Sequence, residues 1–254
     1  MENVKFLLKF GGKKYLKDLQ EGKLYFSNAY NFKNIEKEKL LKGQGDLLEG
    51  GTILIAQDLQ ITNNDNKEVI NINDVKVKLN NDPANLLPVY CLFACFEKDC
   101  YKSYDGKYEI KLSEEIKETI ISHFPKADAV AIIKEPQQFI DDVNSSIGYA
   151  CKSNLVKYFH LKGIMDSKFG IVNDLDYYKY VTQDTPLVKK YGKIILTMNV
   201  DFIYRTLLCK DIFFCNEQEY RFILPEINIK KARNFPIHLN EKIEIVDLDL
   251  FFHK

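Results

Sequence analysis

The sequence shows none of three patterns that would restrict its function at once: a net charge, a long apolar run and the pattern of a signal peptide. Lysine and arginine together number 36, and aspartate and glutamate together also number 36, so the net charge is zero. No overall electric field therefore draws the chain to nucleic acid or to an anionic membrane, although a local patch could. The longest apolar runs have the length of a strand, far below the roughly 20 residues of a membrane-spanning helix. The first residues contain no basic stretch followed by an apolar core. We therefore expect a cytoplasmic protein with no membrane partner.

Metal-binding spacing is also missing. The six cysteines include no C-x-x-C pair, and the group Cys91, Cys95 and Cys100 fits no standard zinc pattern. The four histidines are scattered along the chain. Free cysteines in apolar segments behave as small core residues. We therefore predict no metal site.

Two common catalytic signatures do not occur either. No G-x-S-x-G motif supplies a serine nucleophile, and no G-x-x-x-x-G-K-[ST] or G-x-G-x-x-G loop lies between a strand and a helix. The glycines around Gly43-Gln44-Gly45 therefore predict a turn. Asp46 and Glu49 beside them could bind a divalent ion, but two carboxylates alone make a weak site.

What the sequence does contain is a succession of short strands with a few helices between them. Helices are predicted to begin at Ser113, which can cap the first turn, and at Pro136, which suits the first helical position. No linker rich in Gly, Ser or Pro divides the chain. We predict an α+β fold and a single domain over residues 1–254. The strands are expected at 4–10, 23–27, 88–96, 129–133, 193–198 and 219–224.

Residues 52–87 contain two alternating runs, 68–72 and 75–79, separated by Asn73-Asp74. Such a pair of runs around an Asn-Asp step predicts a β-hairpin inserted into the domain. Farther along, strands are predicted near 168–172 and 177–181. The tyrosines and lysines of residues 177–191 could stack single-stranded bases, or they could be the surface of a half-exposed sheet.

The most distinctive stretch runs from Glu217 to Leu224. With a period of two, Glu217, Glu219 and Arg221 share one face of a strand, and Tyr220, Phe222 and Leu224 form the buried face. A carboxylate can stabilise the oxocarbenium-like state formed when an N-glycosidic bond breaks, while a second carboxylate serves as a base. The same pattern also fits a solvated strand face on which Arg221 neutralises one glutamate. Spacing alone favours the solvated strand face.

A resemblance favours the first interpretation. Glu217-Gln218-Glu219 and the strand after it resemble the E-x-E turn and strand of ADP-ribosyltransferases. The longer run from Cys209 to Arg221 is similar to a large, poorly characterised family of bacterial and phage proteins, a divergent branch of that fold. Some of its members are associated with abortive infection. The segments 24–28 and 45–50 resemble the second strand and the acidic-glycine loop of the same family.

The resemblance implies a split, mostly antiparallel sheet flanked by helices, with NAD as a substrate. It assigns Glu219 to the ribose of NAD and Glu217 to the orientation of the nucleophile. Transferases of this fold carry an Arg or His on the first strand, whereas this chain offers Lys9, which could contact a phosphate as a point charge, or Phe10, which could stack. The candidate NAD contacts are Ser27, Asn28, Lys9, Phe10 and Arg221, and the candidates at the rim of the site are Asp46 and Glu49.

Two functions follow as expectations. The first is an NAD-dependent ADP-ribosyltransferase-like or NAD-cleaving protein of phage–host conflict, with an unknown protein or nucleic-acid acceptor. The alternative is a catalytically inactive binding protein on the same scaffold, such as an inhibitor or sensor of a nucleic-acid-targeting defence system, with a ribonucleoprotein as a possible partner. The missing Arg or His on the first strand favours the alternative. The sequence leaves open whether the protein is an enzyme.

Overall fold

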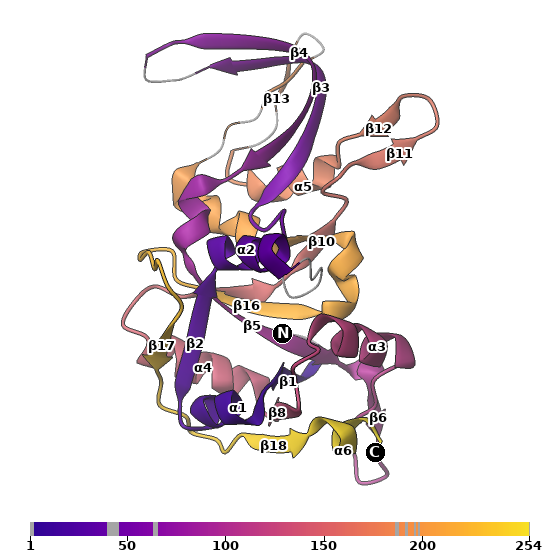
Figure 1. Ribbon diagram of the computed structural model, residues 1–254, viewed down its shortest axis with the longest axis vertical. Helices are drawn as coiled ribbons and strands as arrows, with labels where there is room; N and C mark the ends of the chain where they lie inside the picture. Colours follow the sequence, from indigo (N-terminus) through magenta and orange to yellow (C-terminus); the bar gives the residue numbers. More distant parts are fainter. Residues whose placement is uncertain are drawn as a thin grey trace. The chain divides into compact units, whose positions relative to one another are not determined.

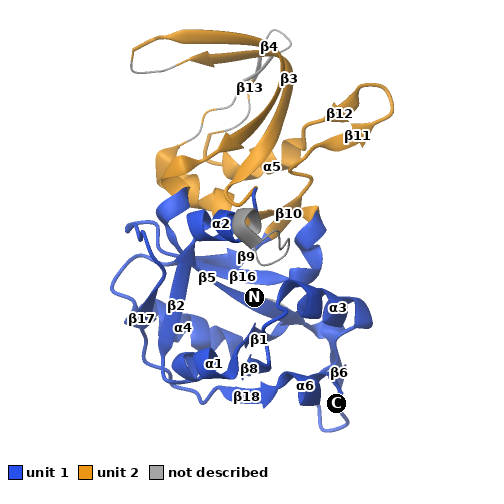
Figure 2. Ribbon diagram, viewed as in Figure 1, with its two compact units in different colours: residues 1–47, 85–156, 213–254 blue, residues 48–84, 157–212 orange. Residues whose placement is uncertain are grey.

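The computed structural model describes the chain in two compact units, shown in Figure 2. Unit 1 comprises residues 1–47, 85–156 and 213–254, and unit 2 comprises residues 48–84 and 157–212. The single domain stays a prediction, because compactness does not measure whether either unit folds alone. The residues described are 3–39, 46–62, 66–185, 188–190, 193–195, 197 and 199–253. The turn predicted at Gly43-Gln44-Gly45 lies outside them.

Unit 1 is built on an antiparallel sheet with helices, which confirms the predicted α+β class (Figure 1). One path through the sheet has six strands, and two further strands continue from the other edge of β5. In spatial order the path is β17 (Arg233–Pro236), β2 (Lys23–Asn28), β5 (Pro88–Phe96), β1 (Val4–Gly11), β8 (Ala129–Ile133) and β18 (Glu244–Asp247). The further strands are β16 (Glu219–Ile223), which pairs with β5, and β9 (Lys152–Leu155), which pairs with β16.

The sheet is split along one edge of β5. Phe93 is paired with both Leu8 of β1 and Glu219 of β16, and Val89 with both Ser27 of β2 and Ile223 of β16. Since a strand has only two edges, β1 and β2 must share the edge opposite β16. β1 pairs with residues 93–96 and β2 with residues 88–89. Residues 90–92 therefore have no partner on that edge among the described strands.

The two faces of this sheet carry separate cores. Alternation along β1 sends Leu7 to the first face and Leu8 to the second. The first face packs against α1 (Lys13–Gln20) and α4 (Pro136–Ser146), and the second against α3 (Glu114–His123) and α6 (Leu248–Phe252). Both predicted helix starts are confirmed: Ser113 Oγ accepts a hydrogen bond from Ile116 N, and Pro136 opens α4.

Short elements complete the described part of unit 1. They are α2 (Ala29–Lys39), η2 (Glu97–Asp99), β6 (Cys100–Lys102), β7 (Tyr108–Ile110) and most of η4 (Ile212–Glu217). The helix η1 (Asp82–Leu86) crosses from unit 2 into unit 1. Unit 2 also contains β3 (Gly51–Thr62), β4 (Val69–Asn80), β10 (Lys157–Phe159), β11 (Ile164–Asp166), β12 (Gly170–Val172), α5 (Leu175–Val181), β13 (Val188–Lys190), β14 (Lys193–Ile195), η3 (Val200–Leu208) and β15 (Cys209–Asp211).

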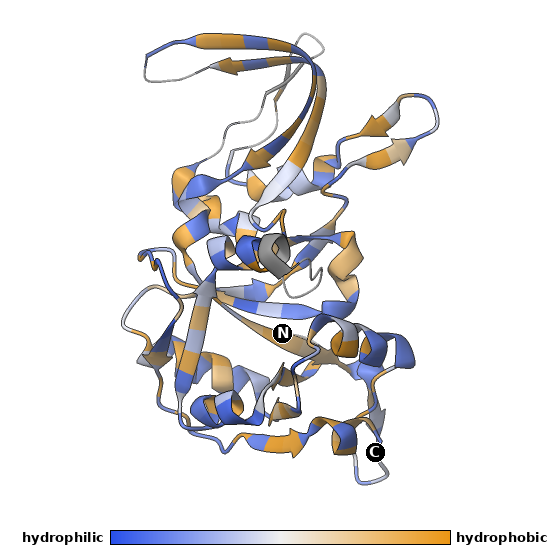
Figure 3. Ribbon diagram, in the orientation of Figure 1, coloured by the Kyte–Doolittle hydropathy of each residue, from blue (hydrophilic) through white to orange (hydrophobic). Residues whose placement is uncertain are grey.

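A hairpin lies within residues 52–87, but the predicted pairing of its strands is wrong, because nearly all residues of the runs 68–72 and 75–79 belong to one strand, β4, and pair with β3 instead of with each other. β3 and β4 are paired from Gly51 with Asn80 to Thr62 with Val69, so the chain reverses beyond Thr62 and not at Asn73-Asp74. Asp74 lies within β4 with a φ of 50°. Asp adopts this left-handed conformation more readily than most residues, so the strand continues through it. Figure 3 shows hydrophobic and hydrophilic residues largely alternating along β4.

The strand predicted at 177–181 is also wrong, because these residues form α5. Asp174 caps the helix by accepting a hydrogen bond from Asp176 N. Tyr177 and Tyr178 are buried and pack with Leu54 in the core of unit 2. Buried rings cannot stack on bases, so this part of the segment does not support nucleic-acid binding. The side chains of Lys189 and Lys190 lie outside the described residues.

No helix in the described part of the chain combines the length and the apolar character that crossing a membrane requires.

The buried carboxylate of Asp142 anchors the segment after β17 to α4. It accepts hydrogen bonds from Asn240 N (2.8 Å), from Asn240 Nδ2 and from Gln138 Nε2 (2.8 Å). Burial favours the protonated acid, but these donors outweigh it and hold the pKa of Asp142 below its ordinary value of 3.8. The ionised form is therefore the one that stabilises the fold.

Replacing Asp142 with alanine is expected to lower the free energy of unfolding at pH 7 by about 1–3 kcal/mol, because three donors lose their acceptor. A lowered pKa gives stability that is complete above the unfolded-state pKa and lost as the pH falls through the folded-state pKa. The difference between the wild type and Asp142→Ala should thus shrink in urea titrations below pH 3.8. The exposed neighbour Asp141→Ala is the control and should change stability by no more than about 0.5 kcal/mol. An equal effect of both substitutions at pH 7 would contradict the anchoring role.

Candidate functional site

The two glutamates do not share a strand face, contrary to the prediction. Gln218 between them has a φ of 42°, a left-handed conformation that interrupts the alternation. Its carbonyl accepts a hydrogen bond from Ala94 N (2.7 Å), and its Nε2 donates to Asp99 Oδ2 (2.9 Å). Glu217 therefore ends η4, and β16 begins only at Glu219.

Glu217 is instead paired with a histidine. Its Oε1 lies 2.7 Å from His123 Nδ1 at the end of α3, and both side chains are buried. The His123 ring stacks on Phe213 at 6.0 Å and meets Phe214 edge-on. Packing and the hydrogen bond together fix the direction of the Glu217 carboxylate.

Glu219 is held by the arginine two residues along the same strand. Arg221 Nε donates to Glu219 Oε2 at 2.5 Å, and the two side chains are 1% and 12% exposed. A charge-assisted contact of this length is a strong one, and burial protects it from screening by salt. The small exposure of Glu219 means that its surroundings exclude most water from the carboxylate. This agrees with the expectation that Arg221 neutralises one glutamate, although the strand face is not solvated.

Polar side chains from four strands project from the second face of the sheet. Residues paired across an antiparallel ladder lie on the same face. Ser27 is paired with Val89, Cys91 with Arg221, and Arg221 also with Asn154 of β9. Since Val89, Cys91 and Phe93 alternate along β5, Glu219 opposite Phe93 joins this face. We call Ser27, Cys91, Asn154, Glu219 and Arg221 the polar row.

The polar row is long enough for an extended ligand. Ser27 and Glu219 are four residues apart along β5 and two strand spacings apart across the sheet, a separation of about 16 Å. The two side chains therefore cannot bond to each other directly, but a ligand with several hydroxyl or phosphate groups could contact both. Ser27 is half-buried, and its hydroxyl is within 3.4 Å of Asn31 Nδ2.

Lys9 lies at the split in the sheet. It alternates with Leu8, so it leaves β1 from the first face, opposite to the polar row. Its Nζ donates to the carbonyl of Cys91 (2.6 Å) and lies 4.8 Å from the centre of the Tyr90 ring. Burial lowers the pKa of Lys9, while Cys91 and the negative charge of Glu219 act to raise it. Lys9 thus satisfies a carbonyl on the edge of β5 where no described strand pairs.

Two of the predicted NAD contacts have structural roles. Phe10 is buried in the second-face core, edge-on to Phe93 at 5.8 Å, so its ring is not available to stack on a ligand. Asn28 is fully buried; its Nδ2 donates to the Ile229 carbonyl, and its Oδ1 accepts from Asn31 N at the start of α2. Because the amide is fully buried and is bonded to the protein at both ends, it is not available to a ligand.

The two residues predicted at the rim are not exposed. Asp46 is 5% exposed and Glu49 is 1% exposed. Asp46 belongs to unit 1 and Glu49 to unit 2. The structure therefore does not place them together on an open edge of the site.

Two residues near these carboxylates, His123 and Cys91, were not predicted from the sequence. His123 lies 94 positions from Glu217, and no local pattern links them. Cys91 looked like a core residue because it sits in a continuous apolar run, yet it is half-buried within the polar row. Among the residues that the structure describes, no three His, Cys, Asp or Glu side chains form a group that could hold a metal ion.

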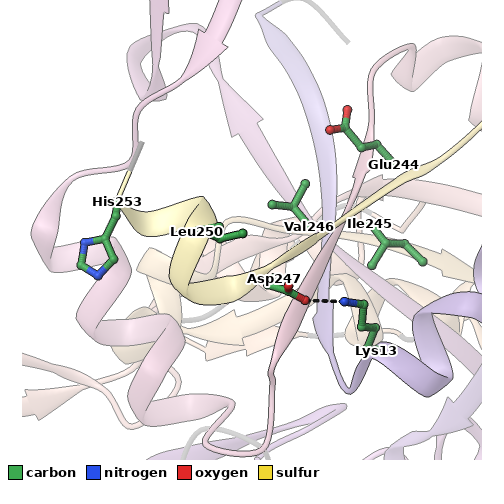
Figure 4. A pocket seen from close by; sticks show the side chains of 7 residues that line it. All are labelled: Lys13, Glu244, Ile245, Val246, Asp247, Leu250 and His253. Carbon is green, nitrogen blue, oxygen red and sulfur yellow. Dashed lines mark hydrogen bonds and ion pairs between the residues drawn. The ribbon is translucent and has the colours of Figure 1, made fainter.

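A pocket of about 430 Å³ on unit 1 lies elsewhere (Figure 4). It is lined by β18 and α6 together with Lys13, whose Nζ is 2.6 Å from Asp247 Oδ1. It shares no residue with the polar row. We therefore do not place the candidate site there.

No protein-family model, no curated protein and no solved structure matches the chain. The chemistry of the polar row therefore has to be argued from its own residues and from the resemblance of the E-x-E segment.

Proposed function

We propose that this chain is an NAD-dependent ADP-ribosyltransferase-like or NAD-cleaving protein that acts at the polar row. The observation that carries the proposal is the Glu219 carboxylate, fixed by Arg221 and nearly withdrawn from water. A preorganised carboxylate in a site of low polarity stabilises a developing positive charge more strongly than one in water. Cleavage of the nicotinamide–ribose bond develops such a charge on the ribose.

In the proposed reaction the bond between the ribose C1′ and the nicotinamide nitrogen breaks, and its electron pair leaves with nicotinamide. Glu219 stabilises the oxocarbenium-like ribose, and an acceptor nucleophile or water then bonds to C1′. The proton that the nucleophile loses passes to Glu217, whose position is fixed by His123. The acceptor would be a protein or a nucleic acid, and loss of cellular NAD would account for a role in phage–host conflict.

The remaining polar groups suit recognition of the dinucleotide. Ser27 on the far side of the polar row can hydrogen-bond to a ribose or a phosphate. Lys9 leaves β1 on the face opposite to the polar row, and its ammonium donates to the Cys91 carbonyl, so it is not part of the proposed set. Asn28 and Phe10 are left out of the proposed set because of their structural contacts.

The test is release of nicotinamide from NAD by the full chain, measured by chromatography with and without protein and nucleic-acid acceptors. Glu219→Gln keeps the size and one acceptor oxygen but removes the charge, and we expect about a hundred-fold slower release. Glu118→Gln, at an exposed position of α3, is the matched control and should behave as the wild type. Equal release by all three proteins, or none from any of them with every acceptor, would sink the enzymatic proposal.

A second candidate is a catalytically inactive binding protein on the same scaffold, such as an inhibitor or sensor of a nucleic-acid-targeting defence system. The first strand favours it, because Phe10 is packed in the core and Lys9 is bonded to the Cys91 carbonyl. Neither residue replaces the forked donors of an Arg. Pull-down from host lysate with and without nuclease distinguishes its partners: a protein partner stays bound after nuclease, and one bridged by RNA is lost.

A further inference from the structure

Two thiols lie side by side at the end of β5. Cys95 Sγ is 3.6 Å from Cys100 Sγ, and both cysteines are free. Cys95 is fully buried and Cys100 is half-buried. Cys100 Sγ also lies 3.3 Å from the Phe96 carbonyl, and Cys95 Sγ lies 3.8 Å from the Asp99 carbonyl. The four-residue loop between them thus brings the sulfurs into contact without a covalent bond.

The two sulfurs are near enough for a disulfide to form after a short movement. A disulfide has a sulfur–sulfur distance of about 2.05 Å, so the two atoms would need to approach by roughly 1.5 Å. The short helix η2 lies between the two cysteines in the chain, and a small adjustment of its backbone can supply this movement. In a reducing compartment such a pair stays reduced and forms a bond only transiently.

The same loop makes a hydrogen bond to Gln218, the left-handed residue between Glu217 and Glu219, which we call the Gln218 turn. Asp99, the last residue of η2, is buried, and its Oδ2 accepts from Phe96 N (3.0 Å) and from Gln218 Nε2 (2.9 Å). Ala94, the residue before Cys95, donates its N–H to the Gln218 carbonyl. Gln218 is thereby held in its left-handed conformation by one residue before Cys95, Ala94, and one residue after it, Asp99. A movement of residues 95–100 acts directly on these hydrogen bonds.

We propose that Cys95 and Cys100 are a redox-modification site, in which a hydroperoxide oxidises the pair to a disulfide and so loosens the Gln218 turn. The Cys100 sulfur, which is the more accessible, attacks the peroxide; the O–O bond breaks, giving a sulfenic acid and an alcohol or water. The Cys95 sulfur then attacks the Cys100 sulfur, and the displaced hydroxide leaves as water with the Cys95 proton. The two thiols lose two electrons and the peroxide gains them. A thiol reductant reverses the step.

The pair is a slow sensor. Burial raises the pKa of the Cys100 thiol, so little of the reactive thiolate is present at neutral pH. The response is therefore to sustained oxidant rather than to a brief pulse.

The bond is tested on the full chain, incubated with hydrogen peroxide, alkylated and digested with trypsin. Lys98 lies between the two cysteines, so a disulfide joins two separate peptides, 79–98 and 99–102. Fragmentation then distinguishes Cys95 from Cys91, which lies in the same peptide. We expect the joined pair in the wild type and in Cys215→Ser, whose thiol is exposed, but not in Cys100→Ser or Cys95→Ala. Absence of the joined pair, or linkage through Cys91, would overturn the proposal.

The coupling is tested by hydrogen exchange of residues 216–221 before and after oxidation. Loss of the bond from Gln218 Nε2 to Asp99 should raise the exchange rate there about five-fold, the factor that corresponds to one hydrogen bond. Peroxide-treated Cys100→Ser should show no change. Equal exchange in reduced and oxidised wild type would overturn the coupling. Neither experiment uses NAD, so their outcomes are independent of the proposed function.

Discussion

Replacing Phe222 with alanine is expected to lower the free energy of unfolding by about 3–5 kcal/mol, because a large side chain is removed from a site that cannot collapse. Phe222 is completely buried on β16, the strand that joins β5 to β9. Its ring contacts three others: Tyr220 at 5.3 Å, Phe139 at 6.0 Å and Tyr90 at 6.5 Å. These neighbours lie on separate elements, so no single movement fills the cavity.

The measurement is urea unfolding followed by circular dichroism, since the chain contains no tryptophan. Phe169→Ala is the matched control, because this ring is 71% exposed, and the same substitution there should change stability by no more than about 0.5 kcal/mol. If Phe222→Ala were no more harmful than Phe169→Ala, the first-face core would not be the centre of stability that its contacts indicate.

The alternation that identifies Phe222 is visible in the sequence. Tyr220, Phe222 and Leu224 were predicted as one buried face, and all three are at most 4% exposed. The helix starts at Ser113 and Pro136 could be predicted equally well, because the start of a helix depends on residues within one turn. Short-range patterns of this kind predicted the α+β class correctly.

Contacts between residues that are far apart in the sequence could not be predicted in this way. The conformation of Gln218 depends on Asp99 and Ala94, more than 100 residues earlier, so the period of two predicted the wrong place for Glu217. The partner of Glu217 is likewise distant. Within unit 2, burial of Tyr177 and Tyr178 favoured a helix where the aromatic content had suggested a strand.

The candidate site shows the same division. That Glu219 and Arg221 lie on one strand face followed from their spacing, but their burial and the presence of Cys91 between β16 and β2 did not. Burial changes how much the Glu219–Arg221 pair contributes to stability. An exposed Glu–Arg contact contributes little, whereas a buried one is costly to break.

Replacing Arg221 with methionine is therefore expected to lower the free energy of unfolding by about 3–5 kcal/mol, because it leaves the Glu219 carboxylate without its counter-charge in a poorly hydrated place. Arg221 is 1% exposed and lies in the middle of β16. Arg233→Met is the control on an exposed arginine, whose guanidinium lies 4.6 Å from the Phe235 ring; it should cost about 0.5–1 kcal/mol. Both are measured by urea unfolding.

The double variant Arg221→Met with Glu219→Leu distinguishes two effects of removing the arginine: the loss of its own contacts, and the negative charge of Glu219 that remains without Arg221. With both charges gone, no carboxylate is left unpaired, and apolar side chains of similar size can fill the space, so the double variant should be more stable than Arg221→Met alone. A double variant as unstable as the single one would mean that Arg221 stabilises β16 through its other contacts and not through Glu219. In that case Arg221 would not be the group that fixes the carboxylate, and the proposed preorganisation of Glu219 would lose its physical basis.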